Sequence, residues 1–371
     1  MDLSDVRRHH LSVILRMLVA GEPRSRAALA AETGLTKGTV SALVADLLER
    51  DLVEELETPK GGRVGRPATD VAATGRTVGG LGIEIGVDHI AAAVVDLTGE
   101  VRAHARHDAD NRTTRPARVI ERVRKVTTAV LADADDLGIR CLGGTVAVPG
   151  LVDPVTGTLY VAPNLHWFDT DLTTMVSRLD LPEALTLSFD NEANLGALAE
   201  LRAGAGQGLR SFVYVSGGRG IGAGIVLDGR LVRGGHGFAG ELGHVIVDPG
   251  GKLCTCGARG CLETIAGRRA EADDDTVADA LAVALRNVVH LLDPEAIVLG
   301  GTLAARGEAF ASDVRDRLAA TTLGARWSPC DVRPSLLGAD AALNGAATVA
   351  LDRVLADPTL VPITSAATLT A

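Results

Sequence analysis

The chain has 371 residues, of which 46% are hydrophobic and 23% are charged, a length that fits two or three domains that each bury a core. No apolar run approaches the roughly 20 residues that cross a bilayer, and the charged N-terminus lacks a signal-peptide pattern, so we expect a cytoplasmic protein without a membrane partner. The net charge of -10 excludes a whole-surface attraction to nucleic acid, so DNA binding would need a local basic patch.

Three short helices are predicted at the N-terminus. Hydrophobic residues recur at helical spacing from about residue 4 to residue 20. Ser25 is placed to cap a second helix that ends at Gly34, and Thr36 is placed to cap a third helix whose Val40 faces inward. This order of helix, turn and helix is typical of a DNA-binding module.

A basic hairpin follows the helices. Residues 52–56 have a strand-like pattern, and the glycines and prolines of residues 59–67 predict a tight turn that carries Arg63 and Arg66. The helices and the hairpin together predict a winged helix-turn-helix domain over residues 1–75.

The second helix of such a module lies in the major groove and directs its first residues at base edges. The predicted contacts to operator DNA are therefore Thr36, Lys37, Thr39 and Ser41, with Arg63 and Arg66 reaching a neighbouring minor groove. The alternative is a small helical domain used only for protein contacts, because short helical patterns often arise by chance. The basic wing favours DNA.

The remainder, residues 76–371, is predicted to be an α/β body because strands alternate with helices. We expect the tail after Pro358 to be frayed. The clearest strand-like segments are residues 81–85, 91–96, 145–148 and 212–215.

A predicted metal-binding loop spans residues 244–261. His244 precedes a cluster of three cysteines, Cys254, Cys256 and Cys261. Three thiolates and one imidazole form a closed tetrahedral site for Zn²⁺, whose role would be structural. The alternative is a set of reduced cysteines without metal, which gives no reason for the clustering. Cys141 and Cys330 are expected to be isolated buried thiols.

Two stretches carry a family resemblance. Residues 23–41, followed by the Gly-Arg-Val-Gly-Arg-Pro turn, resemble the N-terminal module of ROK-family repressors, and residues 241–263 resemble the signature of the ROK family of sugar kinases and regulators. The resemblance implies an actin-like ATPase (ribonuclease H-like) fold of two α/β lobes around a cleft. The other stretches that match are residues 149–153, 163–165, 190–194, 220–224 and 297–301.

The resemblance also implies a sugar site. Its positions in this chain are Asn191, Glu192, Glu241, His244 and Glu263. Carboxylates and amides suit such a ligand because each can bond adjacent hydroxyls in a fixed geometry. Taken singly, each residue reads more simply as a surface acid or a helix cap; together, in the order of the family, they favour the sugar site.

The same resemblance predicts that kinase chemistry has been lost, so no catalytic residue is assigned. Residues 84–88 read Glu-Ile-Gly-Val-Asp where the family's kinases have Asp-x-Gly-Gly-Thr, which places Asp88 where a phosphate would lie. Glu192 stands at the catalytic aspartate position, and Arg219 replaces a threonine of the second phosphate loop. The alternatives are an active sugar kinase with an added DNA-binding domain and, from the glycines of residues 218–222, a weakly supported dinucleotide site.

The function that we expect is a sugar-responsive repressor. Binding of sugar would close the cleft, reposition the winged helices within a homodimer or homotetramer, and change the affinity for the operator.

Overall fold

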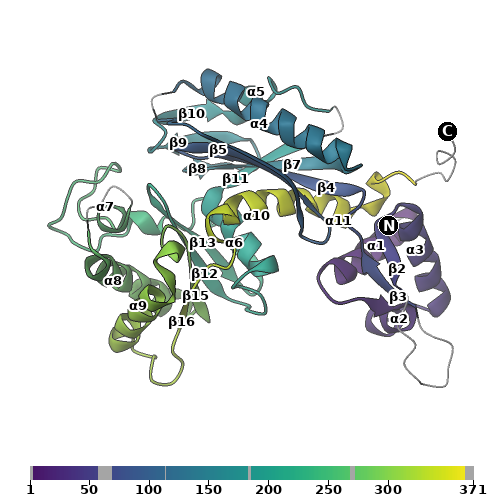
Figure 1. Cartoon of the computed structure of the whole chain (residues 1–371). Helices are drawn as coiled ribbons and strands as arrows, with labels where there is room; N and C mark the ends of the chain where they lie inside the picture. Colours follow the sequence, from purple (N-terminus) through teal and green to yellow (C-terminus); the bar gives the residue numbers. More distant parts are fainter. Residues whose placement is uncertain (1–2, 57–68, 113, 183–184, 268–271, 364–371) are drawn as a thin grey trace.

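The structure is a computed structural model in which a small N-terminal module lies beside a body of two α/β lobes (Figure 1). This confirms the predicted combination of a winged helix-turn-helix and a two-lobed α/β body. The described residues are 3–56, 69–112, 114–182, 185–267 and 272–363.

The N-terminal module contains three helices and a three-stranded sheet of order β1-β3-β2. The predicted caps are confirmed, since the Ser25 hydroxyl accepts the amide of Ala28 at 3.2 Å and the Thr36 hydroxyl accepts that of Thr39 at 3.2 Å. Gly34 ends the second helix with φ 72°, a left-handed conformation that favours glycine. The elements are α1 (Leu3–Val19), β1 (Arg24–Ser25), α2 (Arg26–Thr33), α3 (Lys37–Glu49), β2 (Val53–Leu56) and β3 (Asp70–Ala73).

The tip of the wing joins β2 to β3, which pair antiparallel. Residues 57–68 lie outside the described part of the chain, and they include Arg63 and Arg66. The predicted contacts of these two arginines therefore stay a prediction.

The first lobe is built on a five-stranded sheet in the order β11-β7-β4-β5-β6. Every residue of β4 is buried, because α4 (Pro116–Asp136) packs on one side of the sheet and another helix covers the other. A small sheet of order β10-β9-β8 and the short α5 (Leu172–Val176) complete the lobe. Its strands are β4 (Val78–Ile85), β5 (His89–Asp96), β6 (Val101–Asp108), β7 (Arg140–Val148), β8 (Leu151–Val152), β9 (Thr158–Ala162), β10 (Trp167–Asp171) and β11 (Thr186–Asn191).

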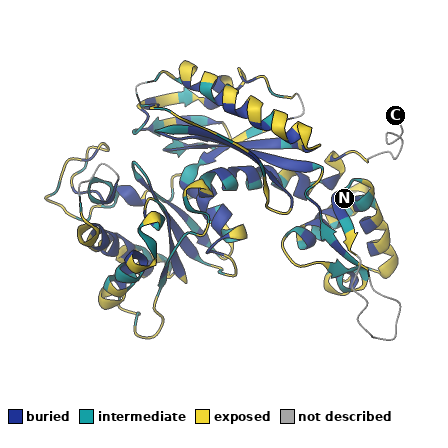
Figure 2. Ribbon diagram, viewed as in Figure 1, coloured by how far each residue is buried: buried dark blue, intermediate teal, exposed yellow. Residues whose placement is uncertain are grey.

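The second lobe repeats this plan with a sheet in the order β14-β13-β12-β15-β16. Helices α8 (Asp274–Leu292) and α9 (Gly307–Thr321) pack on the sheet with buried inner faces and expose their outer faces (Figure 2). The remaining elements are β12 (Phe212–Gly217), β13 (Ile221–Leu227), β14 (Arg230–Val232), η1 (Leu242–His244), α7 (Glu263–Ala266), β15 (Ala296–Gly301), η2 (Ala304–Arg306), β16 (Asp331–Pro334) and η3 (Gly338–Asp340).

Two helices lie between the sheets. Helix α6 (Glu192–Ala203) contacts β12 and β13, whereas α10 (Ala341–Ala350) contacts β4, β5 and β7, and the two helices contact each other. A Cβ on Gly345 would collide with the carbonyl oxygen of Leu195, so only glycine permits this close approach. The lobes therefore meet through a tightly packed helix pair.

The C-terminal segment contradicts the expectation of a frayed tail. Helix α11 (Asp352–Ala356) and the turn η4 (Pro358–Leu360) pack on α1, and Val361 is only 4% exposed. Arg50 donates to the carbonyl oxygens of Thr359 and Val361. The prediction was wrong up to residue 363 because these apolar side chains complete the core of the N-terminal module. The division of the chain at residue 75 stays a prediction.

None of the helices in the described ranges combines the length and the apolar character that a membrane span requires.

Candidate functional site

A cavity of about 810 Å³ lies in the cleft between the lobes. This volume is in the range of small-molecule sites. All five residues of the predicted sugar site line it: Asn191, Glu192, Glu241, His244 and Glu263. The structure therefore brings together side chains that come from three separate stretches of the sequence.

Asn191 and Glu192 lie where β11 ends and α6 begins. The Asn191 carbonyl oxygen accepts the amide of Ala193 at 2.8 Å and caps the helix, while its amide nitrogen donates to the carbonyl oxygen of Gly150 at 2.9 Å. These bonds fix the first turn of α6 and thereby the position of Glu192. Asn191 is therefore a helix cap, the simpler of the two interpretations of this residue, and it also lines the cavity.

The carboxyl group of Glu192 experiences an unfavourable environment for negative charge. Burial, followed by the nearby charges of Glu84, Asp88 and Glu263, raises its pKa from 4.5 to about 7, and the charge of His89 only partly opposes this rise. The Glu192 carboxyl therefore keeps its proton to a higher pH than an ordinary glutamate does, and in the protonated form it can donate a hydrogen bond as well as accept one.

Glu241, His244 and Glu263 come from the loops that follow β14. Glu241 immediately precedes η1, which contains His244, and burial raises the pKa of the Glu241 carboxyl. Glu263 begins α7, and its Oε2 accepts the amide of Ile221 at 3.1 Å. A side chain at Gly220 would collide with this carboxylate, so the glycine leaves room for Glu263 at the cavity wall.

The turns β4–β5 and β12–β13 face each other across the cleft and carry paired charges. The Arg219 Nε lies 3.5 Å from the Asp88 Oδ2, although Arg219 belongs to the second lobe and Asp88 to the first. His89 lies 3.3 Å from Glu84 and 3.5 Å from Asp88. Burial disfavours the charged imidazole, but the bond to Glu84 and its charge outweigh this and raise the pKa of His89. Opposite charges thus occupy the two turns in which the resemblance implies threonines for a working kinase.

Some residues that line the cleft were absent from the predicted site. Asn164 lies within a stretch that resembled the family, so the sequence did carry a signal for it. His89 and Phe168 had no such signal, because neither belongs to a motif and their place in the cleft depends on the fold. Phe168 is 62% exposed at the rim of the cavity.

The predicted metal ligands also converge. The ligand atoms of His244, Cys254, Cys256 and Cys261 all lie within 4.8 Å of one another. The Cys254 sulfur is 3.7 Å from the His244 Nδ1, and the Cys256 and Cys261 sulfurs are 3.6 Å apart. A tetrahedral Zn²⁺ with sulfur at about 2.3 Å and nitrogen at about 2.0 Å separates its donors by about 3.5 to 3.8 Å, so the donor set fits this ion.

The loop geometry supports the site. Gly257 and Gly260 have φ 92° and 70°, and a side chain on Gly260 would collide with the carbonyl oxygen of Asp248. His244 presents its Nδ1 to the cysteines, while its Nε2 lies 3.9 Å from Glu241 in the cleft. A bound ion would therefore hold the imidazole in place beside the predicted sugar site. Of the other cysteines, Cys141 is buried as predicted and Cys330 is partly buried.

The predicted DNA-contacting residues that the structure describes all lie on the surface at the start of α3. Thr36, Lys37, Thr39 and Ser41 are exposed, while Val40 is fully buried. The Thr36 and Thr39 hydroxyls also bond each other at 2.9 Å. Among the described residues, Lys37 has no ion-pair partner, whereas Arg26 is paired with Glu55 at 2.6 Å. The first turn of α3 is thus available to a duplex.

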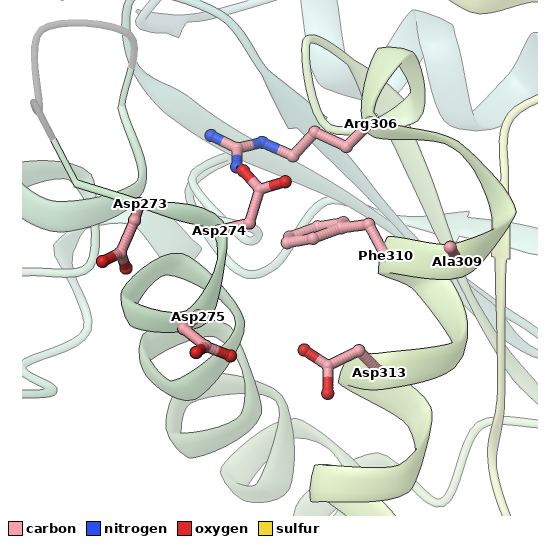
Figure 3. Close-up of a pocket in the computed structure, with 7 residues that line it drawn as sticks. All are labelled: Asp273, Asp274, Asp275, Arg306, Ala309, Phe310 and Asp313. Carbon is pink, nitrogen blue, oxygen red and sulfur yellow. The ribbon is translucent and has the colours of Figure 1, made fainter.

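A second pocket lies on the outer surface between α8 and α9 (Figure 3). Its acidic side chains pair with arginines: Asp274 with Arg306, and Asp313 with Arg317 at 3.0 Å. Arg306 also covers the Phe310 ring at 5.0 Å. This pocket is an ion-pair network on a solvated face.

Comparison with protein families matches two segments of the chain. The ROK family matches residues 80–274 and 269–353, and the MarR family matches residues 5–64. The chain is 26% identical to the xylose repressor of Bacillus spizizenii over 96% of this chain and 99% of that protein. It is 30% identical to a putative xylose repressor of a Caldicellulosiruptor species over 93% of this chain and 96% of that protein.

Solved structures show the same architecture. A ROK family transcriptional regulator, described as a homologue of the Escherichia coli MLC protein, superposes with a TM-score of 0.76 and 23% identity over 96% of this chain and 98% of that chain. A ROK family glucokinase from Streptomyces griseus, solved with glucose and AMPPNP, covers 74% of this chain and 99% of its own length, with a TM-score of 0.63 and 25% identity. The body thus has the kinase fold, the whole chain has the regulator's architecture, and the protein belongs to the ROK family.

Proposed function

We propose that the chain is a sequence-specific DNA-binding regulator, a repressor of carbohydrate-metabolism genes that a sugar controls. The observation that carries the proposal is that one chain joins an exposed recognition helix to a cleft lined by hydroxyl-binding side chains. The names of full-length relatives, which are xylose repressors, support the same role.

Operator recognition is assigned to the N-terminal module. Thr36, Lys37, Thr39 and Ser41 are exposed at the N-terminus of α3, where a recognition helix meets base edges and phosphates. Arg63 and Arg66 would add charge contacts from the wing. Because the whole chain has a net charge of -10, this local presentation of cationic groups is the feature that supports DNA binding.

The sugar is assigned to the cleft. Asn191, Glu192, Glu241, His244 and Glu263 surround the cavity, and carboxylates bond hydroxyl donors strongly. A Zn²⁺ ion held by His244 and the three cysteines would keep His244 and the neighbouring loop in register with the ligand. The ion would be structural, because four protein ligands leave no open position for a water or a substrate.

Kinase activity is not expected. The Asp88 carboxylate repels phosphate, and its pairing with Arg219 engages the cation that would attract one. The regulator instead uses the cleft as a sensor: sugar stabilises one arrangement of the lobes, and operator affinity changes in a homodimer or homotetramer.

The test is a set of gel-shift titrations on DNA from upstream of the chain's own gene, with and without a panel of monosaccharides chosen by thermal shift. We expect specific binding that one sugar weakens, and loss of sequence preference in Lys37→Ala at about 1–3 kcal/mol per lost base contact. Arg63→Ala with Arg66→Ala should weaken binding to all sequences and flatten its salt dependence. Failure of the wild-type chain to bind any such DNA would refute the proposal.

A second candidate function, an active sugar kinase with an added DNA-binding module, is favoured by one observation. With a pKa of about 7, Glu192 could serve as a general base near neutral pH. ADP release coupled to candidate sugars separates the two. Turnover at the usual kinase rates of roughly 1–100 per second would establish this alternative.

A further inference from the structure

Two helices, α6 and α10, lie between the lobes, and α10 leads towards the N-terminal module (Figure 1). Helix α6 begins with Glu192 in the cleft and carries Arg202 in its last turn. Helix α10 follows Ala339, which also lines the cleft, and leads through Leu351 into α11 beside α1. A helix of 12 residues such as α6 spans about 18 Å. Both helices thus have one end at the cavity and the other end near the module.

The two helices are packed closely against each other. Glycine at position 345 is required where α10 meets the backbone of α6 at Leu195, and Gly80 and Gly82 allow the same close approach of α10 to β4. Packed interfaces of this kind have discrete arrangements and do not deform continuously. A displacement at the start of α6 is therefore carried to its far end.

At that far end, one carboxylate joins three elements. Asp352, the first residue of α11, accepts a bond from the Arg202 Nη2 of α6 at 2.7 Å and lies 3.9 Å from the Arg16 Nη1 of α1. The pairing is incomplete, because the Asp352 Oδ1 and the Arg202 Nη1 are buried atoms without a hydrogen-bond partner in the described chain. A small shift of α6 would change which arginine the carboxylate binds.

Helix α11 is also part of the module's core. Val354 and Leu355 are buried with Leu11 and Leu15 of α1, and the Ser12 hydroxyl donates to the carbonyl oxygen of Leu355 at 2.6 Å. Because α11 and α1 share this core, a change in the position of α11 reorients the whole module.

We infer that Asp352 is a positioning residue that couples the sugar cleft to the DNA-binding module through Arg202 and Arg16. The inference rests on the proposed function and names the junction through which it is regulated. Asp352 touches neither ligand. Its role is to transfer the position of α6 to α1, so that the operator affinity depends on the state of the cleft.

The experiment compares operator affinity with and without a saturating sugar in Asp352→Asn and the wild-type chain. Coupling between two sites typically changes affinity by about 5- to 150-fold, and we expect the variant to reduce this ratio by at least about fivefold, towards unity. Partly exposed ion pairs contribute little to stability, so the thermal midpoint and the sugar affinity without DNA should remain near the wild-type values. If Asp352 had only a structural role, Asp352→Asn would lower the thermal midpoint and leave the ratio of operator affinities with and without sugar unchanged.

Asp357→Asn is the matched control. Asp357 also links the C-terminal segment to α1, through Arg8 at 3.8 Å, and its described side-chain hydrogen bonds go to Thr359, not to α6. Asp357→Asn should keep the wild-type ratio of operator affinities with and without sugar. Arg202→Gln should reproduce the loss, and combining it with Asp352→Asn should add nothing further, as expected for residues in one network.

The outcomes separate the two claims. If the wild-type chain binds the operator and responds to sugar, an unchanged ratio in Asp352→Asn overturns the inference, and so does an equal loss in Asp357→Asn. If no sugar changes the operator affinity of the wild-type chain, the proposed sugar control itself is refuted, and the inference with it.

Discussion

The two halves of the cleft use charge in different ways. Near the metal loop, Glu241 and Glu263 face the cavity, and the only side-chain or backbone partners described for their carboxylates are an imidazole and an amide. Near the β4–β5 and β12–β13 turns, Asp88 and Arg219 are paired with each other. The first half leaves carboxylate acceptors at the cavity, whereas the charges of the second half are paired with each other. Under the proposed function, the first half would bind sugar hydroxyls and the second half would no longer hold a phosphate.

The largest effect should come from breaking the predicted metal-binding loop, which carries His244 beside the first half of the cleft. Cys261→Ser removes a buried ligand and should abolish stoichiometric zinc, which elemental analysis measures. Zinc present at 1,000 times its Kd would stabilise the folded chain by about 4 kcal/mol. Loss of the ion in Cys261→Ser should therefore lower the thermal midpoint by roughly 8–16 °C. Cys141→Ser, at a cysteine remote from the loop, is the control for zinc content. Unchanged zinc in Cys261→Ser would contradict the site.

A smaller effect is expected from a single carboxylate in the same half. Glu263→Gln retains an oxygen that can accept the Ile221 amide but loses the charge that bonds a hydroxyl. A hydrogen bond to a charged group contributes about 1.5–3 kcal/mol, so the sugar affinity should fall by roughly 10- to 150-fold in calorimetric titrations. The exposed Glu308→Gln should bind sugar normally. If Glu263→Gln and Glu308→Gln bound sugar with equal affinity, Glu263 would not belong to the sugar site.

The Asp88–Arg219 pair in the second half of the cleft can be tested by a variant that should gain affinity. Asp88→Asn should release Arg219 and remove a negative charge, so the affinity for ADP should rise by about tenfold, or 1.4 kcal/mol. Arg219→Gln leaves Asp88 in place and should bind ADP no better than the wild-type chain. Equilibrium dialysis with labelled ADP measures both, and a rise in Arg219→Gln alone would reverse our account of this pair.

A further expected effect is a pH dependence of the thermal stability. Because the pKa of Glu192 is about 7 in the folded chain and 4.5 ordinarily, the folded state holds the extra proton between these values. This contribution to stability is fully present below about pH 4.5 and is lost as the pH rises through about 7. Glu192→Gln should therefore gain thermal stability relative to the wild-type chain at pH 7.5 and lose that advantage near pH 4.5. A constant difference across this range would show that burial does not perturb the group.

The sequence predicted features that local patterns encode. Ser25 and Thr36 predicted where two helices begin, because a capping side chain and the amide that it binds are only three residues apart. The predicted metal-binding loop was also recognisable, because its four candidate ligands lie within 18 residues, from His244 to Cys261. The residues of the predicted sugar site came from the family resemblance, and the structure brings them around one cavity.

The remaining features depend on partners that are distant in the chain. Nothing near Arg219 indicates Asp88, and nothing near Asp352 indicates Arg16 or Arg202, since each pair forms only when separate lobes or modules meet. The expectation for the C-terminal tail was wrong for the same reason. Its apolar residues are too few to form a core of their own, and their place in the N-terminal module follows only from the tertiary fold.

The C-terminal completion of the N-terminal module has a consequence for synthesis of the protein. Domains generally fold from the N-terminus onwards as the ribosome makes them. Here the core around Leu11 and Leu15 lacks Val354, Leu355 and Val361 until almost the whole chain has been translated. A chain whose synthesis stops early would expose the apolar face of α1. We therefore expect the N-terminal module to reach its complete, DNA-binding form only when the two-lobed body has also been made.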